Sequence, residues 1–555
     1  MRHGLADAIA WLTQSWSRLA QRLGTDVREL VCMAGIVLAG AVLRFANLPV
    51  RGGWDSDQGT EMLALRAAIS AGRLPTFGPE AISVTSSFHH GALYYDLLLP
   101  AAWLGNGDPR WVVAEIALLS LLVIPIVWWI GRTIGGAAAG LSAALLAATS
   151  ASLIGYSTFI WNPTLVEPGA AVAFLGAWQA IRTQRARWWI LAAVGAAVAV
   201  QAHIAAAVII LPLAAALLVD LRRSPSIHRR RILICGAVGA AVFLVTYLPY
   251  IASELGSNWA DTRGMLAYFS EPNSASSAGP AIRLFFATIR ILAWPLTRWP
   301  MVDLKPAVVP ALMIASAVLI GGVWRIVATA HRTADAPTPV ISPREVEATA
   351  PGLEQLGVRL VLGWLVLIIL ALGLGLHAVS EVQELPTEQY HVVADPLVLV
   401  AVGLILGALW RVLPGRGPIT LARRVAAVAC VVAVVGWNVG HWPPLTAADG
   451  GWPAAQAAAN RVEAAANGSS VALVPLFAAK GSDAYLYPLS LDGVSVVPPD
   501  EATIIVVLCD TFWTEGCAGP AEEAWLTQST LGHLLKIDEF HAAPDRVLTV
   551  YRRAP

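Results

Sequence analysis

Residues 54–61 read Trp-Asp-Ser-Asp-Gln-Gly-Thr-Glu, and residues 89–96 read His-His-Gly-Ala-Leu-Tyr-Tyr-Asp. Both stretches lie in one loop between the first two long apolar runs, and together they carry Asp55, Asp57, Glu61, His89 and His90. Carboxylates and imidazoles at a membrane surface lose hydration unless they bind something, so this cluster indicates a functional site. The rest of the chain is then the frame that holds the loop at the bilayer face.

The composition sets the fold class. Of the 555 residues, 57% are hydrophobic and only 13% are charged, and the mean hydropathy is +0.63. A chain this apolar is predicted to be a polytopic α-helical membrane protein. Its formal net charge is zero, so no basic or acidic field favours a nucleic-acid partner. The partner implied by the composition itself is the lipid bilayer.

Apolar runs of about 17 to 25 residues can span a bilayer. On this basis the sequence predicts about eleven transmembrane helices. They fall at 30–46, 111–131, 135–155, 162–182, 188–203, 205–220, 231–251, 306–328, 358–376, 392–410 and 424–441.

Arginine clusters predict the orientation of these helices, because cytoplasmic loops carry an excess of Arg and Lys. All the clusters fall on one side if residues 91–104, which are apolar but short, lie in the membrane interface without crossing it. The prediction is a multi-pass protein of the plasma (inner) membrane with a cytoplasmic N-terminus, so that the acidic loop faces outward.

The domain organisation follows from the same pattern. Residues 1–441 form the predicted transmembrane domain, with an outward catalytic loop and interfacial helices at 47–110, a second large outward loop at 252–304 and a cytoplasmic linker at 331–357. Residues 442–555 have a mixed composition, with a helical segment near 452–466 and strand-like runs at 471–476, 504–509 and 547–551. They are predicted to be a small soluble extracytoplasmic α/β domain, in which Cys509 and Cys517 could form a disulfide.

The acidic stretch has two local interpretations. Asp55 and Asp57 flank one serine, so one of them could act as a general base, or one could cap the helix that starts near Thr60. His89 and His90 could hold an anionic phosphate, either when protonated or as neutral donors. Each histidine could also be purely structural.

The order of first span, outward acidic loop, helical pattern at 61–72 and His90-Gly91-Ala92-Leu93-Tyr94-Tyr95 resembles the GT-C glycosyltransferases, in particular the protein O-mannosyltransferase and lipid A aminoarabinose transferase branch. Those families carry an Asp-Glu pair in the first outward loop and a Lys-Pro-Pro-Leu or His-Pro-Pro-Leu motif at the interfacial helix. Asp57-Gln58 and His90-Gly91-Ala92-Leu93 occupy the matching places. The resemblance implies that Asp57 is the catalytic base, supported by Asp55 and Glu61, and that His90 lies at the lipid phosphate with His89.

The chain also departs from the family pattern. Gln58 replaces the family's Glu, both prolines are missing, and the second outward loop, which usually has an Arg and an Asp, reads Tyr-Ser-Thr-Phe-Ile-Trp-Asn-Pro at 156–163. Asn162 could hydrogen-bond where a carboxylate would have, or could cap the helix that opens at Pro163. Glu167 could replace the missing charge, or could pair with a neighbouring helix.

Further residues are candidates for the substrate site. Arg283, Arg290 and Arg298 recur at about helical spacing beside aromatic residues, as in an interfacial helix whose guanidiniums grip either the donor phosphate or lipid headgroups. Tyr390 sits where relatives often carry Arg-Tyr. The predicted substrate pocket comprises Tyr94, Tyr95, Trp161, Asn162, Glu167 and Tyr390.

The resemblance implies a membrane glycosyltransferase that moves a sugar from a polyprenyl-phosphate-linked donor to a cell-envelope acceptor. No phosphate-binding loop or dinucleotide fingerprint is present, no cofactor is predicted, and the scheme requires no metal. Two other classes stay open. A transporter or flippase would also show many spans and polar residues within them, and a non-catalytic relative could bind lipid-linked sugar without turning it over.

Overall fold

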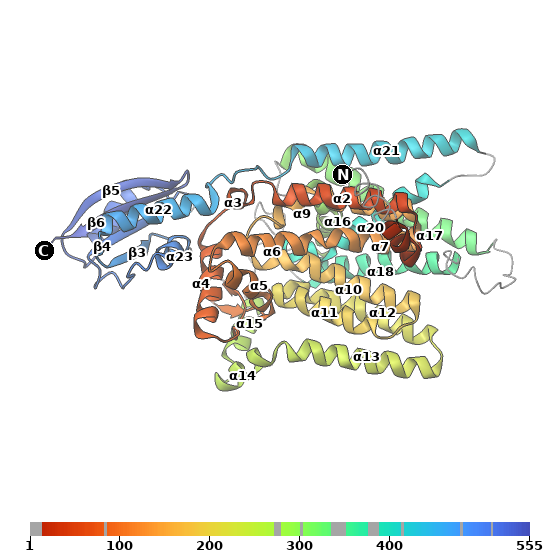
Figure 1. Ribbon diagram of the computed structural model, residues 1–555, viewed down its shortest axis with the longest axis horizontal. Helices are drawn as coiled ribbons and strands as arrows, with labels where there is room; N and C mark the ends of the chain where they lie inside the picture. Colours follow the sequence, from red (N-terminus) through yellow and green to blue (C-terminus); the bar gives the residue numbers. More distant parts are fainter. Residues whose placement is uncertain are drawn as a thin grey trace, which may run out of the picture.

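The computed structural model describes residues 14–82, 86–270, 279–299, 304–334, 351–375, 388–411, 416–477, 481–511 and 514–554. Most of the helices lie side by side along the long axis of the molecule, and a small sheet with its own helices stands at one end of this bundle (Figure 1).

The bundle is built from α2 (Val27–Phe45), α3 (Leu48–Arg51), α4 (Ser56–Ala71), α5 (Leu93–Leu104), α6 (Pro109–Leu121), α7 (Val123–Gly135), α8 (Ala137–Thr149), α9 (Ala151–Tyr156), α10 (Val166–Thr183), α11 (Trp188–Ala202), α12 (Ile210–Arg223), α13 (Ser226–Val245), α14 (Leu248–Gly256), α15 (Ala260–Ser270), α16 (Pro280–Thr297), α17 (Leu304–Ala334), α18 (Pro351–Gly375), α20 (Asp395–Trp410) and α21 (Gly417–Gly440). It also contains the 3-10 helices η1 (Asn162–Leu165), η2 (Ile204–Ile209), η3 (Glu388–Tyr390) and η4 (Val392–Ala394), and the antiparallel strands β1 (Glu80–Ile82) and β2 (Ser87–His89).

The predicted class, a polytopic membrane protein, is confirmed. In the described residues six segments are long and apolar enough to cross a membrane: Pro109–Gly135, Ile204–Arg223, Ala307–Ala330, Gly352–Gly375, Val392–Trp410 and Gly417–Gly440. A seventh would be the pair Ser226–Val245 and Leu248–Gly256, which bends by 52° at its break. The figure of about eleven crossings stays a prediction.

Close packing of small residues fixes the helices behind the acidic loop. α10 and α11 approach so closely that a Cβ built on Gly169 would lie 2.7 Å from the nitrogen of Ala199, and one on Gly195 would lie 2.4 Å from the nitrogen of Ala173. Small residues allow such contact between helices in a membrane, where no hydrophobic effect drives association. Asn162, in η1, directly precedes this closely packed pair, Glu167 lies in the first turn of α10, and His203 caps the end of α11.

Two predicted segments differ from their expected form. α17 extends to Ala334 and α18 begins at Pro351, so both described ends of the expected linker at 331–357 are helical, and its middle lies outside the described residues. α16 buries Ala287 and residues 289–297, and it packs against α9, α17, α18 and α20. The expectation of an interfacial helix therefore fits only the first turns of α16.

The C-terminal residues form a four-stranded sheet in the order β3-β4-β6-β5. Its elements are α22 (Gly451–Ala466), β3 (Val471–Pro475), α23 (Asp483–Leu491), β4 (Ile504–Asp510), α24 (Pro520–Gln528), β5 (Leu534–Ala543) and β6 (Arg546–Arg553). β3 and β4 are parallel, and the other neighbouring strands are antiparallel. The helix and strands expected near 452–466, 471–476, 504–509 and 547–551 match α22, β3, β4 and β6 within a few residues.

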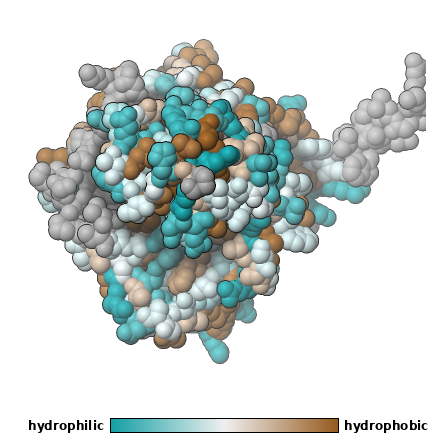
Figure 2. Space-filling view, turned by 90° about the vertical axis from the view of Figure 1, so that its left-hand side faces the viewer, coloured by the Kyte–Doolittle hydropathy of each residue, from teal (hydrophilic) through white to brown (hydrophobic). Residues whose placement is uncertain are grey.

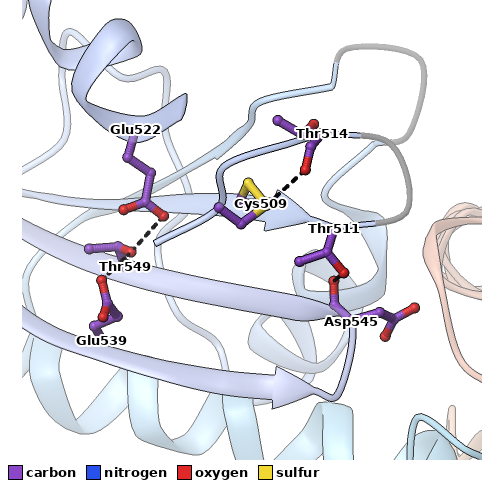
Figure 3. The surroundings of a disulfide bond; sticks show 8 residues. Cys509, Thr511, Thr514, Glu522, Glu539, Asp545 and Thr549 are labelled. Atoms are coloured by element: carbon purple, nitrogen blue, oxygen red, sulfur yellow. Dashed lines mark hydrogen bonds between the residues drawn. A yellow bond between two sulfur atoms is a disulfide. The ribbon is translucent and has the colours of Figure 1, made fainter. Parts of the chain in front are cut away.

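A disulfide closes the loop after β4. Cys509 is bonded to Cys517, with a Cα–Cα distance of 5.5 Å, and the neighbouring hydroxyl of Thr549 donates to Glu522 at 2.9 Å (Figure 3). On the face that carries the sheet, hydrophilic residues lie over the centre with hydrophobic residues among them (Figure 2).

Candidate active site

Asp55 is the residue that caps α4. Its carboxylate accepts a hydrogen bond from the backbone nitrogen of Asp57 at 2.9 Å, while the side chain of Gln58 accepts one from the nitrogen of Asp55, also at 2.9 Å. This reciprocal pattern is a capping box, which satisfies amide groups that a helix start leaves unpaired. The capping alternative for the acidic stretch therefore belongs to Asp55, and the carboxylate of Asp57 does not serve as the cap.

Asp57 is exposed on the first turn of α4 and lines a pocket of about 320 Å³. The other lining residues are Gly53, Trp54, Asp55, Gln58, Phe159, Trp161 and Asp449. The rings of Phe159 and Trp161 are stacked with centroids 5.8 Å apart, so one wall of the pocket is aromatic and another is acidic. The structure thus brings Asp55, Asp57 and Trp161 together at the positive end of a helix.

Gln58 connects the first outward loop to the second. Its side chain is buried and its amide nitrogen donates to the carbonyl oxygen of Ile160 at 2.7 Å. An ionised glutamate has no proton to donate, so the replacement of the family's Glu has a local physical reason. The amide of Gln58 therefore links the start of α4 to the segment that carries the aromatic wall, Phe159 and Trp161.

Glu61 does not line this pocket. It is 5% exposed, it shares a hydrogen bond with Tyr95, and its second oxygen Oε2 has no hydrogen-bond partner among the described residues. Burial raises the pKa of Glu61 to about 8, with the Tyr95 hydrogen bond acting in the opposite direction and Asp57 adding a smaller increase. Tyr94 and Tyr95 are themselves buried on α5, so these residues join α4 to α5 beneath the loop.

Two residues that sequence reasoning missed connect the C-terminal part of the chain to the pocket: Asp449, which lines it, and Arg546 at the start of β6, which pairs with Asp449. Asp449 accepts hydrogen bonds from the backbone nitrogens of Trp54 at 2.7 Å and Gly451 at 2.9 Å. Arg546 pairs with Asp449 at 3.1 Å and donates to the carbonyl oxygen of Trp54 at 2.8 Å. We call these two residues the strap, because they bind the sheet to the acidic loop.

His89 and His90 have different surroundings. Nδ1 of His89 lies 2.7 Å from a carboxylate oxygen of Asp261 on α15, and the same carboxylate accepts from the backbone nitrogen of His89. His89 therefore anchors α15 to β2, and its imidazole is already engaged by a carboxylate.

His90 is buried in a row of rings. Its ring centroid lies 5.0 Å from that of His203, which lies 5.4 Å from that of Tyr390. Burial, with smaller contributions from His203 and His89, lowers the pKa of His90 well below its usual value. Of the two alternatives for its action, the structure favours a neutral donor over a protonated imidazole. His90 does not line the pocket of Asp57.

The three arginines of α16 are spread along the helix. Arg290 is buried beside His391, next in sequence to Tyr390, whereas Arg283 lies near the helix start and Arg298 caps its end. Fifteen residues of helix separate Arg283 from Arg298, which is about 22 Å. One phosphate cannot contact all three, and Arg290 is the one that the structure places beside His391, the residue that follows Tyr390.

Asn162 and Glu167 lie away from the pocket. Asn162 begins η1 without capping it, and its amide donates to the carbonyl oxygen of Ala202 at 2.7 Å. Glu167 is 1% exposed and its carboxyl group lies beside that of Asp395 at the start of α20. Both side chains therefore make contacts between helices. In the part of the chain that the structure describes, no group of three or more acidic, His or Cys residues is arranged to hold a metal.

Comparisons with known proteins agree with the resemblance stated from the sequence. Residues 103–250 match the family described as dolichyl-phosphate-mannose-protein mannosyltransferase. This match confirms the resemblance to the GT-C glycosyltransferases for the part of the chain that it covers. No curated protein matches the chain.

Several solved structures are similar to the chain. ArnT from Cupriavidus metallidurans bound to undecaprenyl phosphate is 16% identical, with 94% of this chain and 97% of that chain covered and a TM-score of 0.47. The oligosaccharyltransferase of Archaeoglobus fulgidus is 12% identical, with 89% and 70% covered and a TM-score of 0.46. The arabinofuranosyltransferase AftD from Mycobacteria is 14% identical, with 95% and 40% covered and a TM-score of 0.48.

Proposed function

With the GT-C resemblance confirmed over residues 103–250, we propose that this membrane protein transfers a sugar from a polyprenyl-phosphate-linked donor to a cell-envelope acceptor at the outer side of the plasma membrane. One observation carries the proposal. Asp55 caps α4, so the carboxylate of Asp57 is presented to a pocket with an aromatic wall. Aromatic and carboxylate side chains together suit a carbohydrate, which offers apolar faces and hydroxyl groups.

The reaction is a substitution at the anomeric carbon of the donor. The acceptor hydroxyl oxygen forms the new bond to this carbon while the bond to the phosphate oxygen breaks, and polyprenyl phosphate leaves with the electron pair. Asp57 takes the hydroxyl proton as general base. The pocket of about 320 Å³ suits part of a glycan at the acceptor position.

The donor phosphate needs a separate set of groups. We assign it to the row that begins at His90, with Tyr390 and Arg290 at its far end, because these groups can donate hydrogen bonds and Arg290 can balance charge. A neutral His90 would act as a donor. The assignment gives Arg283, Arg298 and His89 no direct role in holding the phosphate.

Sidedness is part of the proposal. The connection from α10 to α11 and the start of α13 lie at the end of the bundle opposite the C-terminal sheet (Figure 1). These segments carry Arg185, Arg187 and Arg231, which supports a cytoplasmic location for that end. The disulfide in the sheet suits an oxidising compartment. The N-terminus would then be cytoplasmic, and residues 442–555 would lie outside.

The test uses the purified full-length protein in liposomes, with a radiolabelled polyprenyl-phosphate sugar and cell-envelope extract. Release of polyprenyl phosphate that depends on the extract is expected. Counterflow of the lipid-linked sugar without its cleavage would favour a transporter, and saturable binding without either activity would favour a non-catalytic relative.

A further inference from the structure

The end of the bundle opposite Asp57 holds a second, basic pocket. It lies where the connection from α10 to α11 meets the start of α13, and its volume is about 530 Å³. Arg185, Arg187, His228 and Arg231 provide its polar wall, and Ile234 and Cys235 provide apolar surface. Among the described residues that line it there is no acidic side chain.

The nearby carboxylate is engaged elsewhere. Asp220 is fully buried behind the pocket wall and accepts hydrogen bonds from the indole of Trp189 at 2.9 Å and the amide of Gln184 at 3.1 Å. Asp220 therefore does not neutralise the arginines that line the pocket. An anionic ligand in the pocket would meet a concentrated positive charge.

The pocket opens beside a helix that few neighbours cover. In α13 only Ile232 and Gly239 are buried, whereas Leu233 and Ile234 are 56% and 51% exposed. α13 packs mainly against α11, and a Cβ built on Gly236 would reach α12 only at 4.0 Å. The seam between α12 and α13 is thus loose and apolar directly next to the arginines.

We propose that this pocket binds the phosphate-bearing headgroup of an anionic phospholipid, with its acyl chains along the exposed face of α13. Guanidiniums bind phosphate through charge-assisted hydrogen bonds, and basic pockets between helices at the cytoplasmic boundary are suited to such headgroups. The twenty residues of α13 span about 30 Å, the thickness of the hydrocarbon core. The lipid therefore lies in the leaflet opposite the acidic loop, and the inference does not depend on the proposed transferase activity.

The test is native mass spectrometry of the full-length protein with added phosphatidylglycerol or phosphatidylcholine of the same acyl chains. The protein should retain phosphatidylglycerol preferentially. The double variant Arg185→Gln/Arg231→Gln should weaken this binding by at least about tenfold, because two charge-assisted contacts are lost.

A matched control removes the same charge at the same end of the bundle. Arg222→Gln/Arg223→Gln changes two exposed arginines at the end of α12 that do not line the pocket, and it should bind phosphatidylglycerol as the unmodified protein does. Thermal unfolding without lipid checks that both variants fold. Equal retention by both double variants would overturn the proposal. A different outcome is that inorganic pyrophosphate raises the unfolding temperature of the protein without being displaced by phosphatidylglycerol. That result would overturn the proposal in favour of a soluble phosphate ligand.

Discussion

Arg546, at the start of the last strand, pairs with Asp449 at 3.1 Å and donates to the carbonyl oxygen of Trp54 at 2.8 Å. Through these contacts the C-terminal sheet holds the backbone that precedes Asp55 and Asp57. The Trp54 indole adds a hydrogen bond to the carbonyl oxygen of Ala484 at 2.8 Å. The geometry of the acidic loop therefore depends on residues that follow it by about four hundred positions or more.

The strap predicts a positioning role for Arg546. Arg546→Ala should lower turnover by about 10- to 100-fold, because displacement of a catalytic group by about 1 Å can have that effect. Arg546→Lys should recover part of the loss, since lysine keeps the charge but not the fork that reaches both Trp54 and Asp449. Donor binding should be unchanged in both variants, since the donor groups lie elsewhere.

The control for the strap is Arg461→Ala. Arg461 forms an exposed ion pair with Asp538 in the same part of the chain, and such surface pairs contribute little to stability. Equal turnover in Arg546→Ala and Arg461→Ala would remove the positioning role.

The helices and strands near the strap could be predicted from the sequence, but the contacts of the strap itself could not. The helix expected near 452–466 is found as α22, because its apolar period lies within one segment. The link from Arg546 to Asp449 and the bond from Gln58 to Ile160 join residues that lie far apart in sequence. Neither leaves a local period or motif, so neither could be predicted from one sequence.

The same limit applies to the second loop. Asn162 was expected to replace a carboxylate or to cap a helix, but the contact that occupies it is the carbonyl of Ala202 at 2.7 Å. The row from His90 to His203 and Tyr390 joins three separate segments. The resemblance to a known family suggested His90 and Tyr390, whereas the place of His203 between them required the folded chain.

Gln58→Glu tests the bond between the two outward loops. The change restores the family residue but puts a carboxylate oxygen against the carbonyl oxygen of Ile160. Loss of the buried donor should lower the free energy of unfolding by about 1 to 3 kcal/mol, with no gain in turnover. Gln456→Glu, at an exposed position of α22, is the matched control and should leave unfolding unchanged. A Gln58→Glu protein as stable as this control would show that the hydrogen bond from Gln58 to Ile160 does not stabilise the fold.

Glu61 predicts a pH dependence of stability. Its folded-state pKa of about 8 lies above the ordinary value of 4.5, so the folded protein binds a proton that the unfolded chain releases. The resulting stabilisation is complete below about pH 4.5 and is lost as the pH rises through about 8. Glu61→Gln imitates the protonated form and does not titrate. Its unfolding temperature should therefore rise relative to that of the unmodified protein as the pH is raised from 5 to 9. A difference for Glu61→Gln that stays constant across this pH range would exclude its raised pKa.

The disulfide predicts the sensitivity of the C-terminal sheet to reductant. Closing the eight-residue separation between Cys509 and Cys517 should stabilise the folded state by about 2.5 kcal/mol on a chain-entropy basis. Cys517→Ser should lower the free energy of unfolding, measured by denaturant titration, by about this amount. Reduction of the unmodified protein should lower it equally. Cys430→Ser, at a free cysteine in α21 and outside the sheet, is the control. Alkylation of both Cys509 and Cys517 in unreduced protein would contradict the pairing.

The catalytic assignment predicts unequal effects of two similar substitutions. Asp57→Asn keeps the shape of the side chain but removes proton acceptance, so turnover at saturating donor should fall by about 10²- to 10⁴-fold. Asp55→Asn should cost much less, because asparagine is itself a good N-cap and can still accept from the nitrogen of residue 57. Unfolding temperatures of both variants should stay close to that of the unmodified protein. If Asp55→Asn abolishes turnover and Asp57→Asn does not, the base is Asp55 and the capping geometry changes on substrate binding; if neither variant loses turnover, the acidic loop does not carry the chemical step.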